Sequence, residues 1–64
     1  MPDFRMYDYV STPNGKGTIQ WANKDGSFQV WHLKKDFHGT LPPKFTDRSP
    51  TIAMNYKPEE MDYA

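Results

Sequence analysis

Residues 17–33 constrain the fold more than any other part of the chain, because they predict two β-strands joined by a tight turn. Apolar side chains alternate with polar or small ones on both sides of the turn, and this period of two is typical of half-buried strands. The turn falls at residues 23–26 (Asn-Lys-Asp-Gly), since Asp-Gly is a strong hairpin signal and glycine adopts the positive φ of such a turn without a Cβ clash. We therefore expect a hairpin with strands over 18–23 and 27–33.

The alternation also predicts which side chains of the hairpin enter the core. One face carries the four apolar residues Ile19, Trp21, Phe28 and Val30. Successive side chains of a strand point to opposite faces, so Trp31 and Leu33 are expected on the other face. A large aromatic residue that is exposed there would be informative about binding.

The N-terminal part predicts one more strand and a turn. Apolar and polar residues alternate over Phe4–Val10, which predicts a first strand, although Asp8 interrupts one face. Residues 12–15 (Thr-Pro-Asn-Gly) predict a turn, because proline presets φ and asparagine and glycine tolerate tight conformations. The Gly-Lys-Gly run at 15–17 lacks the longer glycine run and the following helix of a phosphate-binding loop. We interpret it as a turn glycine followed by a closely packed strand start.

The C-terminal half predicts a long irregular segment and two short strands. Residues 34–50 contain a glycine and three prolines, and no regular element fits them. Alternation resumes at Thr51–Tyr56, which predicts the fourth strand. Residues 57–61 predict a helical turn, because proline occupies its first helical position and carboxylates its first turn. The last three residues are expected to add a brief fifth strand.

Length and composition limit the stability of this fold. The chain has 64 residues and no cysteine, so neither a disulfide nor a thiolate metal site is available to it. We interpret residues 1–64 as a single domain whose core supplies roughly 3–5 kcal/mol of net stability. Its ten aromatic residues compensate in part, because each large ring buries about 150–250 Å². Oligomerisation is the other usual source of stability for so small a core.

The charge balance limits the classes of partner. Eight basic and eight acidic side chains cancel, although residues 11–57 hold seven of the basic ones and only three acidic ones. This basic excess is mild for a nucleic-acid-binding domain, and the neutral total argues against a mimic of a polyanion. The sequence contains no apolar run long enough to span a membrane and no signal peptide. We therefore expect a soluble, cytoplasmic protein without a membrane partner.

The pattern of glycines and apolar residues resembles that of SH3-like small β-barrels, including KOW-type modules. The resemblance is carried by Val10–Ile19, by Gly26 and Val30, and by Ile52–Met61. In that family a glycine-flanked strand follows a turn, a hairpin partner returns after a second glycine, and a helical turn precedes a short last strand. The resemblance implies an all-β fold, a small SH3-like barrel of about five short antiparallel strands with one helical turn near the C-terminus.

The resemblance implies binding rather than catalysis, since SH3-like barrels mostly engage peptides, nucleic acids or other subunits. An exception is the type II dihydrofolate reductases, which are tetramers of small SH3-like chains with a Val-Gln-Ile-Tyr motif in the active-site strand. The comparable strand here, Ile52–Tyr56, lacks that motif. We therefore expect no enzymatic activity and no cofactor.

His32, Asp36 and His38 are the candidates for a metal or acid–base site. Their spacing matches no defined metal site, and no serine or cysteine nucleophile constellation accompanies them. We interpret them as ordinary surface or strand-edge residues and predict no metal. Glu59 and Glu60 are adjacent on the helical turn, so their side chains diverge, and capping of that turn accounts for them.

Two binding hypotheses remain. A protein–protein adaptor or inhibitor, of the kind that phages and mobile elements encode, is favoured because the neutral chain attracts phosphate only weakly. The alternative is a small barrel that binds single-stranded DNA or RNA, with lysines along the phosphates and aromatic rings stacked on the bases. A homo-oligomer that hides Trp31 is a third arrangement. The predicted binding residues are Trp31, Lys34, Lys35, Phe37, Leu41, Lys44 and Phe45.

Overall fold

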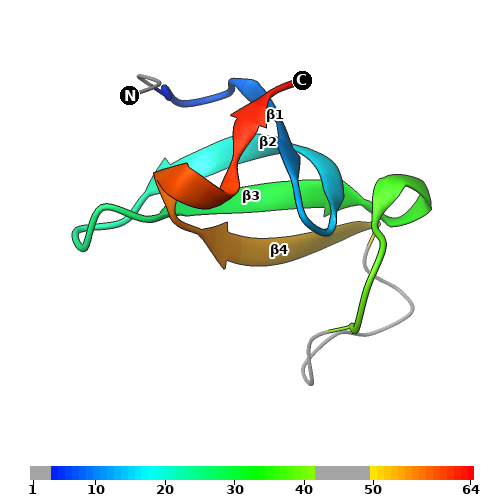
Figure 1. Ribbon diagram of the computed structural model, residues 1–64. Helices are drawn as coiled ribbons and strands as arrows, with labels where there is room; N and C mark the ends of the chain where they lie inside the picture. Colours follow the sequence, from blue (N-terminus) through cyan, green and yellow to red (C-terminus); the bar gives the residue numbers. More distant parts are fainter. Residues whose placement is uncertain (1–3, 42–49) are drawn as a thin grey trace.

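Five antiparallel β-strands form one sheet in the spatial order β4-β3-β2-β1-β5 (Figure 1). The computed structural model describes residues 4–41 and 50–64. Along the chain the elements are β1 (Tyr9–Thr12), β2 (Gly15–Ala22), β3 (Phe28–Leu33), the 3-10 turn η1 (Lys34–Asp36), β4 (Thr51–Tyr56), the 3-10 turn η2 (Pro58–Glu60) and β5 (Asp62–Tyr63). The predicted all-β class is confirmed. Among the described residues β4 and β5 form two edges and the sheet is not closed, so the SH3-like barrel stays a prediction.

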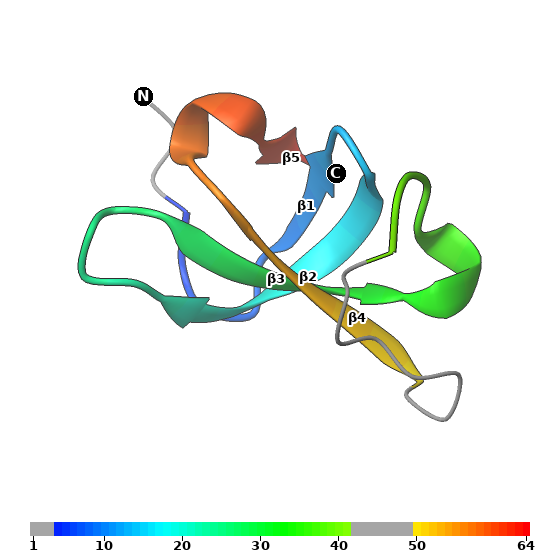
Figure 2. The same ribbon diagram turned by 90° about the horizontal axis from the view of Figure 1, so that it is seen from below.

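The C-terminal elements match the prediction. β4 has the predicted bounds, and the predicted helical turn and short fifth strand follow it as η2 and β5. A capping box closes η2, because the Lys57 backbone N–H donates to Glu60 Oε1 at 3.0 Å. This segment carries the chain across to β1, so that the first and last strands lie side by side (Figure 2).

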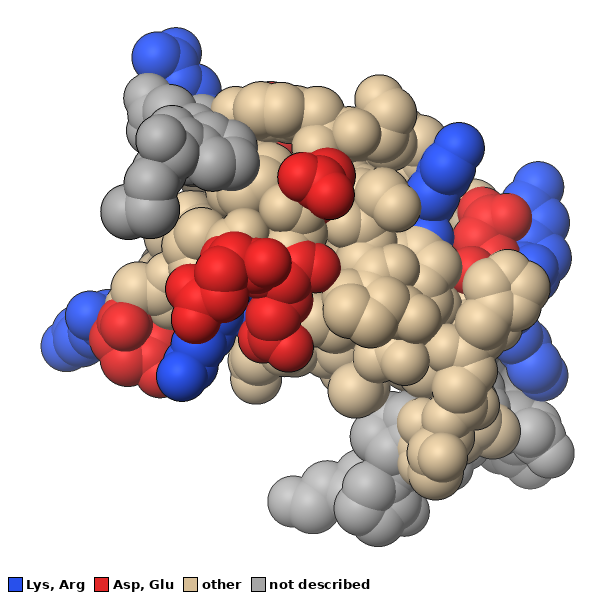
Figure 3. Space-filling view, in the orientation of Figure 1, with Lys and Arg blue, Asp and Glu red and all other residues tan. Residues whose placement is uncertain are grey.

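Acidic side chains gather where this segment crosses the sheet. η2 and β5 lie in front of β3 in Figure 1, and the space-filling view in the same orientation shows a group of acidic side chains there (Figure 3). η2 contributes Glu59 and Glu60, and β5 contributes Asp62. One side of the molecule is therefore acidic although the whole chain is neutral.

The first strand begins later than the sequence predicts. β1 starts at Tyr9 rather than Phe4, because the residues before it form a tight turn. The Arg5 N–H donates to Asp8 Oδ2 at 2.8 Å, and Tyr7 has a φ of 69°. A residue in the left-handed region does not continue a strand. Asp8, which interrupts the apolar alternation, therefore belongs to this turn, and its carboxylate closes the turn by accepting from Arg5.

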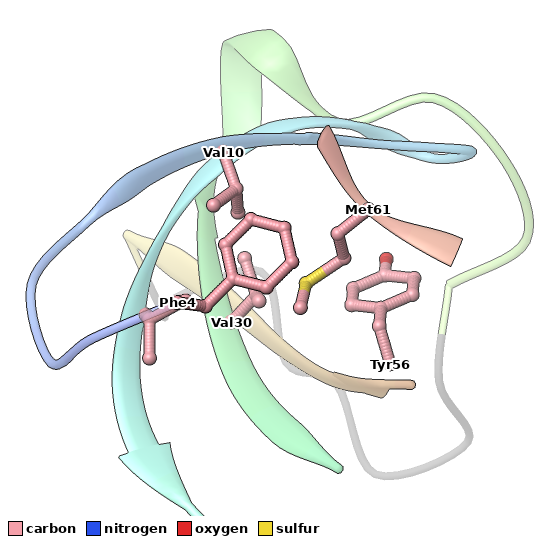
Figure 4. Close-up of a cluster of buried hydrophobic side chains, with 6 residues drawn as sticks. Phe4, Val10, Val30, Tyr56 and Met61 are labelled. Atoms are coloured by element: carbon pink, nitrogen blue, oxygen red, sulfur yellow. The ribbon is translucent and has the colours of Figure 1, made fainter. Parts of the chain in front are cut away.

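The core lies between the inner face of the sheet and segments from both ends of the chain. The buried apolar residues are Phe4, Val10, Ile19, Val30, Ile52, Tyr56 and Met61. Phe28 and Met54 are partly buried against this cluster. Phe4 and Met61 point into the same cluster from opposite ends of the chain (Figure 4). The two ends of the chain therefore complete a core that the central strands alone would leave open.

Trp21 is the exception to the predicted core of the hairpin. Its side chain is 61% exposed, whereas Ile19 and Val30 are fully buried as predicted. Ile19 lies opposite Val30, but Trp21, only two residues later, lies opposite Gln29. This register shift is a β-bulge, and one extra residue in β2 moves the side chains beyond it to the opposite face. The prediction of Trp21 in the core is therefore wrong, because the alternation fails at the bulge.

The β2–β3 turn has three residues, 24–26, between Asn23 and Ser27. The Asn23 N–H donates to the Ser27 carbonyl at 2.8 Å, and Gly26 has a φ of 92°, as expected for a three-residue hairpin loop. The Ser27 hydroxyl and N–H donate to Asp25 Oδ1 at 2.6 and 3.0 Å. These two hydrogen bonds hold the pKa of the Asp25 carboxyl below its ordinary value. The turn predicted at residues 23–26 is confirmed, although β2 ends at Ala22 and β3 begins at Phe28.

His32 is fully buried, which corrects its interpretation as a surface or strand-edge residue. Its Nδ1 lies 3.0 Å from the Lys16 carbonyl oxygen and its Nε2 lies 2.8 Å from the Tyr56 hydroxyl. A carbonyl only accepts hydrogen bonds, so Nδ1 carries the proton and donates to it. Nε2 then accepts from the Tyr56 hydroxyl, whose oxygen accepts from Asn14 Nδ2 at 2.9 Å. Desolvation lowers the pKa of His32, which favours the neutral imidazole that this network requires.

The same network positions η1, where the sequence predicts no regular element. The Phe37 ring, just after η1, packs edge-on against the His32 ring with centroids 5.3 Å apart. Phe37 also forms an isolated β-bridge with Gly15, and the His38 N–H donates to the Asn14 carbonyl at 2.6 Å. The β1–β2 turn, β3 and the segment after η1 are therefore held together at one end of the sheet.

Gly17 occupies a position where no side chain fits. A Cβ there would lie 2.6 Å from Val30 Cγ1, 2.8 Å from the Trp31 carbonyl oxygen and 3.0 Å from His32 Nδ1. Gly15, two residues earlier, has a φ of 117° in the left-handed region. The interpretation of residues 15–17 as a turn glycine and a closely packed strand start is confirmed.

We expect the free energy of unfolding to fall as the pH is lowered from about 7.5 to about 5. Burial lowers the pKa of folded His32, so below about pH 6.5 the unfolded chain binds more protons than the folded one. The loss approaches about 1.4 kcal/mol per pH unit until the folded pKa is reached, and urea titrations measure it. His38→Gln removes the exposed histidine and should keep this slope. A slope that is absent in the unchanged protein, or that disappears in His38→Gln, contradicts the assignment to His32.

Gly17→Ala should destabilise the protein by about 1–3 kcal/mol, because the added methyl group overpacks the contact with Val30 and the β3 backbone. Lys16→Ala changes the adjacent exposed side chain and should alter the free energy of unfolding by less than about 0.5 kcal/mol. Urea denaturation compares the two variants. If both are equally stable, β2 and β3 do not approach as closely as described.

Candidate functional site

The side chains that point away from the core on β2, β3 and β4 form one continuous surface, which we call the outer face. Its nine members are Lys16, Thr18, Trp21, Gln29, Trp31, Leu33, Thr51, Ala53 and Asn55. Trp31 and Leu33 are 42% and 49% exposed, so their predicted position opposite the core is confirmed. The β-bulge adds Trp21 to the same face. The outer face therefore presents three large apolar side chains to solvent.

Strand pairing arranges these side chains in rows across the sheet. One row, extended onto β1, contains Tyr9, Thr18, Trp31 and Ala53. The next row contains Trp21, Gln29 and Asn55. Trp21 and Trp31 are thus diagonal neighbours on adjacent strands, within reach of one ligand. With Tyr9, which is 51% exposed, the two rows expose three aromatic rings.

Three side-chain hydrogen bonds hold this surface in place. The Trp31 Nε1–H donates to Gln29 Oε1 at 3.1 Å, which orients the indole along β3. At the β2–β3 turn, Asn23 Nδ2 donates to Ser27 Oγ at 3.0 Å and to Asn55 Oδ1 at 3.1 Å, which ties the turn to β4. Aromatic groups that are already ordered lose less conformational entropy on binding.

The charges near the outer face are mostly basic. Its nine members include one charged side chain, Lys16, and no carboxylate. Lys34 and Lys35 follow Leu33 directly on η1 and are exposed, with Asp36 offsetting part of their charge. The acidic residues of η2 and β5 gather on the side of the molecule shown in Figure 3. The carboxylates of η2 are therefore separated from an aromatic face with lysines at one end, whereas Asp62 of β5 shares a cross-strand row with Ser11 and Lys16.

An open pocket of about 430 Å³ adjoins the lysine end of the outer face. It is lined by Ser11, Gly15, Lys16, Asp36 and His38. Ser11 and Lys16 are cross-strand partners, whereas Asp36 and His38 come from η1 and the segment after it. The three predicted candidates for a metal site do not converge, because His32 lies in the core. Within residues 4–41 and 50–64, no group of three or more histidine, cysteine and acidic side chains is placed to hold a metal ion.

Part of the predicted binding set does meet at this surface. Trp31 lies on the outer face, and Lys34 and Lys35 adjoin it where β3 ends. Phe37 does not lie on the outer face, because its side chain is half-buried and its ring packs against His32. In the sequence Phe37 is an aromatic residue in an irregular segment, and nothing there indicates that its ring packs against a buried histidine.

Of the other predicted residues the structure describes Leu41 alone, and the prediction misses two exposed aromatic residues. Leu41 is 46% exposed and lies beyond η1, whereas Lys44 and Phe45 lie outside the described residues. Trp21 is missed because the alternation predicts it in the core, and nothing local marks the bulge. Tyr9 is missed because the predicted first strand ends near it instead of beginning there.

The described helical segments are two single 3-10 turns, and none is long or apolar enough to cross a membrane. Comparison with protein-family models, with curated proteins and with solved structures finds no match to this chain. A functional assignment therefore depends on the surface of the molecule itself.

Proposed function

We propose that this protein is a non-enzymatic binding module that docks a protein partner on its outer face. The observation that supports the proposal is the exposure of Trp21, Trp31 and Leu33 on one sheet face that carries no carboxylate. Tryptophan is enriched among the residues that dominate binding energy, and charged residues are depleted at interface centres. The same proposal includes a cytoplasmic location and an SH3-like barrel fold. It also includes a role as an adaptor or inhibitor, of the kind that phages and mobile elements encode.

The polar groups of the outer face support binding rather than catalysis. Apart from Lys16 they are hydroxyls and amides, and the amides of Gln29 and Asn55 already accept hydrogen bonds from Trp31 and Asn23. Such groups orient a partner but do not form an acid–base pair beside a nucleophile. The buried His32 has both ring nitrogens engaged in the core network.

Affinity capture with the full chain as bait tests the proposal. Trp31→Ser and Trp21→Ser should each weaken binding of the captured partner by roughly 30-fold, which corresponds to the loss of about 2 kcal/mol at an interface hot spot. Tyr7→Ser is the matched control, because it removes an exposed aromatic residue from the turn before β1, which is not part of the outer face. Circular dichroism checks that each variant is folded. A partner that still binds both tryptophan variants as tightly as the unchanged protein rules out the outer face.

Single-stranded nucleic acid is the second candidate ligand, favoured by the position of Lys16 on the same face as Trp31. Stacking on the indoles and contacts between lysines and phosphates would bind a strand without sequence preference. Tryptophan fluorescence at low salt, titrated with an oligothymidylate, should then be quenched, and Lys16→Glu combined with Lys35→Glu should abolish the quenching. A titration without any fluorescence change excludes this candidate.

A further inference from the structure

β4 is an edge strand without the features that normally prevent edge pairing. Among the described strands it pairs only with β3, so alternate backbone N–H and C=O groups along its six residues point away from the sheet. Its sequence, Thr51–Tyr56, contains no charged residue and no proline. Its register with β3 continues without a bulge. An edge of this kind is a template for a second extended chain.

The opposite edge of the sheet differs in each respect. β5 has only two residues, and one of them is Asp62. Short strands and charged side chains are the usual protection of a sheet edge. Of the two edges, β4 is therefore the one suited to pairing with another strand.

The start of β4 lies beside basic side chains. Thr51 is paired with Leu33, and the Lys34 N–H lies 3.4 Å from the Pro50 carbonyl oxygen. These contacts place η1, which carries Lys34 and Lys35, next to the first residue of β4. Asp36 on the same turn offsets one of the two lysines, so η1 contributes one net positive charge at this end.

The end of β4 leads into acidic side chains. Tyr56 is followed by Lys57 and then by η2, which carries Glu59 and Glu60. Two carboxylates against one lysine leave one negative charge at this end. Among the described residues, the two ends of an uncharged strand thus carry opposite net charges. Two identical strands are then complementary in charge when they run antiparallel.

We propose that two copies of this chain pair antiparallel along β4 around a two-fold axis. In such an isologous interface each contact occurs twice. The start of β4 in one copy then lies beside its end in the second copy, which brings Lys35 of each copy toward Glu59 of the other. A parallel arrangement would instead bring like charges together at both ends.

Side-chain facing limits the register of this pairing. In one continuous sheet, residues of the two β4 strands that lie directly opposite each other must be on the same face. Because facing alternates along a strand, the two-fold axis then passes through a residue and not between two residues. The residues nearest the middle of β4 are Ala53 and Met54. In both registers the paired side chains of β4 are uncharged, apart from Lys57 just beyond its end. Two five-stranded sheets then form one continuous sheet, and backbone hydrogen bonds between the copies stabilise a chain whose own core is small. The outer face stays exposed, so this inference does not depend on the proposed protein partner.

Sedimentation equilibrium of the full chain, at concentrations up to about 1 mM, measures the dimer dissociation constant. Lys35→Glu and Glu59→Lys should each raise this constant about tenfold, because each places like charges side by side. The double variant Lys35→Glu, Glu59→Lys exchanges the two charges and should return the constant to within about threefold of the unchanged protein. Ala53→Lys adds a charge at an exposed position of the open edge and should abolish the dimer.

Asp62→Lys is the matched control for Glu59→Lys, because it changes the net charge equally but lies on β5. It should leave the dissociation constant unchanged. A chain that stays monomeric at about 1 mM overturns the proposal, as does a dimer that none of the β4-end variants or Ala53→Lys weakens. A double charge variant that dimerises no better than the single variants overturns the antiparallel arrangement.

Discussion

The buried imidazole of His32 is the contact on which the rest of the structure depends. It sits on β3 and bonds to the backbone of β2 through Lys16 and to β4 through Tyr56, so one side chain joins both neighbouring strands. Tyr56 extends the connection to Asn14 in the β1–β2 turn. The imidazole can donate and accept in this way only when it is neutral. In the described part of the chain, every buried side-chain polar atom has a hydrogen-bond partner, so the network is complete.

A chain of 64 residues cannot bury all of its aromatic rings, and two local features decide which remain outside. Gly17 lets β2 and β3 approach so closely that a Cβ there would lie 2.6 Å from Val30 Cγ1, and Ile19, Val30 and the imidazole beside it are fully buried. The bulge that follows sends Trp21 outward. The tight core and the exposed aromatic face are therefore two results of the same pairing of β2 with β3.

Elements formed by local chemistry are the ones that the sequence predicts well. The glycine of the hairpin turn, the alternating β4 and the proline and carboxylates of η2 act within a few neighbouring residues. His32 is misjudged because its partners lie 16 and 24 residues away in the sequence, and a polar residue is buried only when such partners converge. For the candidate site, Trp31 and its neighbouring lysines follow from the alternation of β3. Trp21 does not, because a bulge is a property of the strand pair.

The orientation of the His32 ring tests this account most directly, and long-range ¹H–¹⁵N NMR of the imidazole measures it. At about pH 7 we predict a neutral ring that carries its proton on Nδ1 and has an unprotonated Nε2 accepting from Tyr56. A ring protonated on Nε2, or a charged ring at that pH, would contradict the account, because the Lys16 carbonyl has no proton to donate to Nδ1.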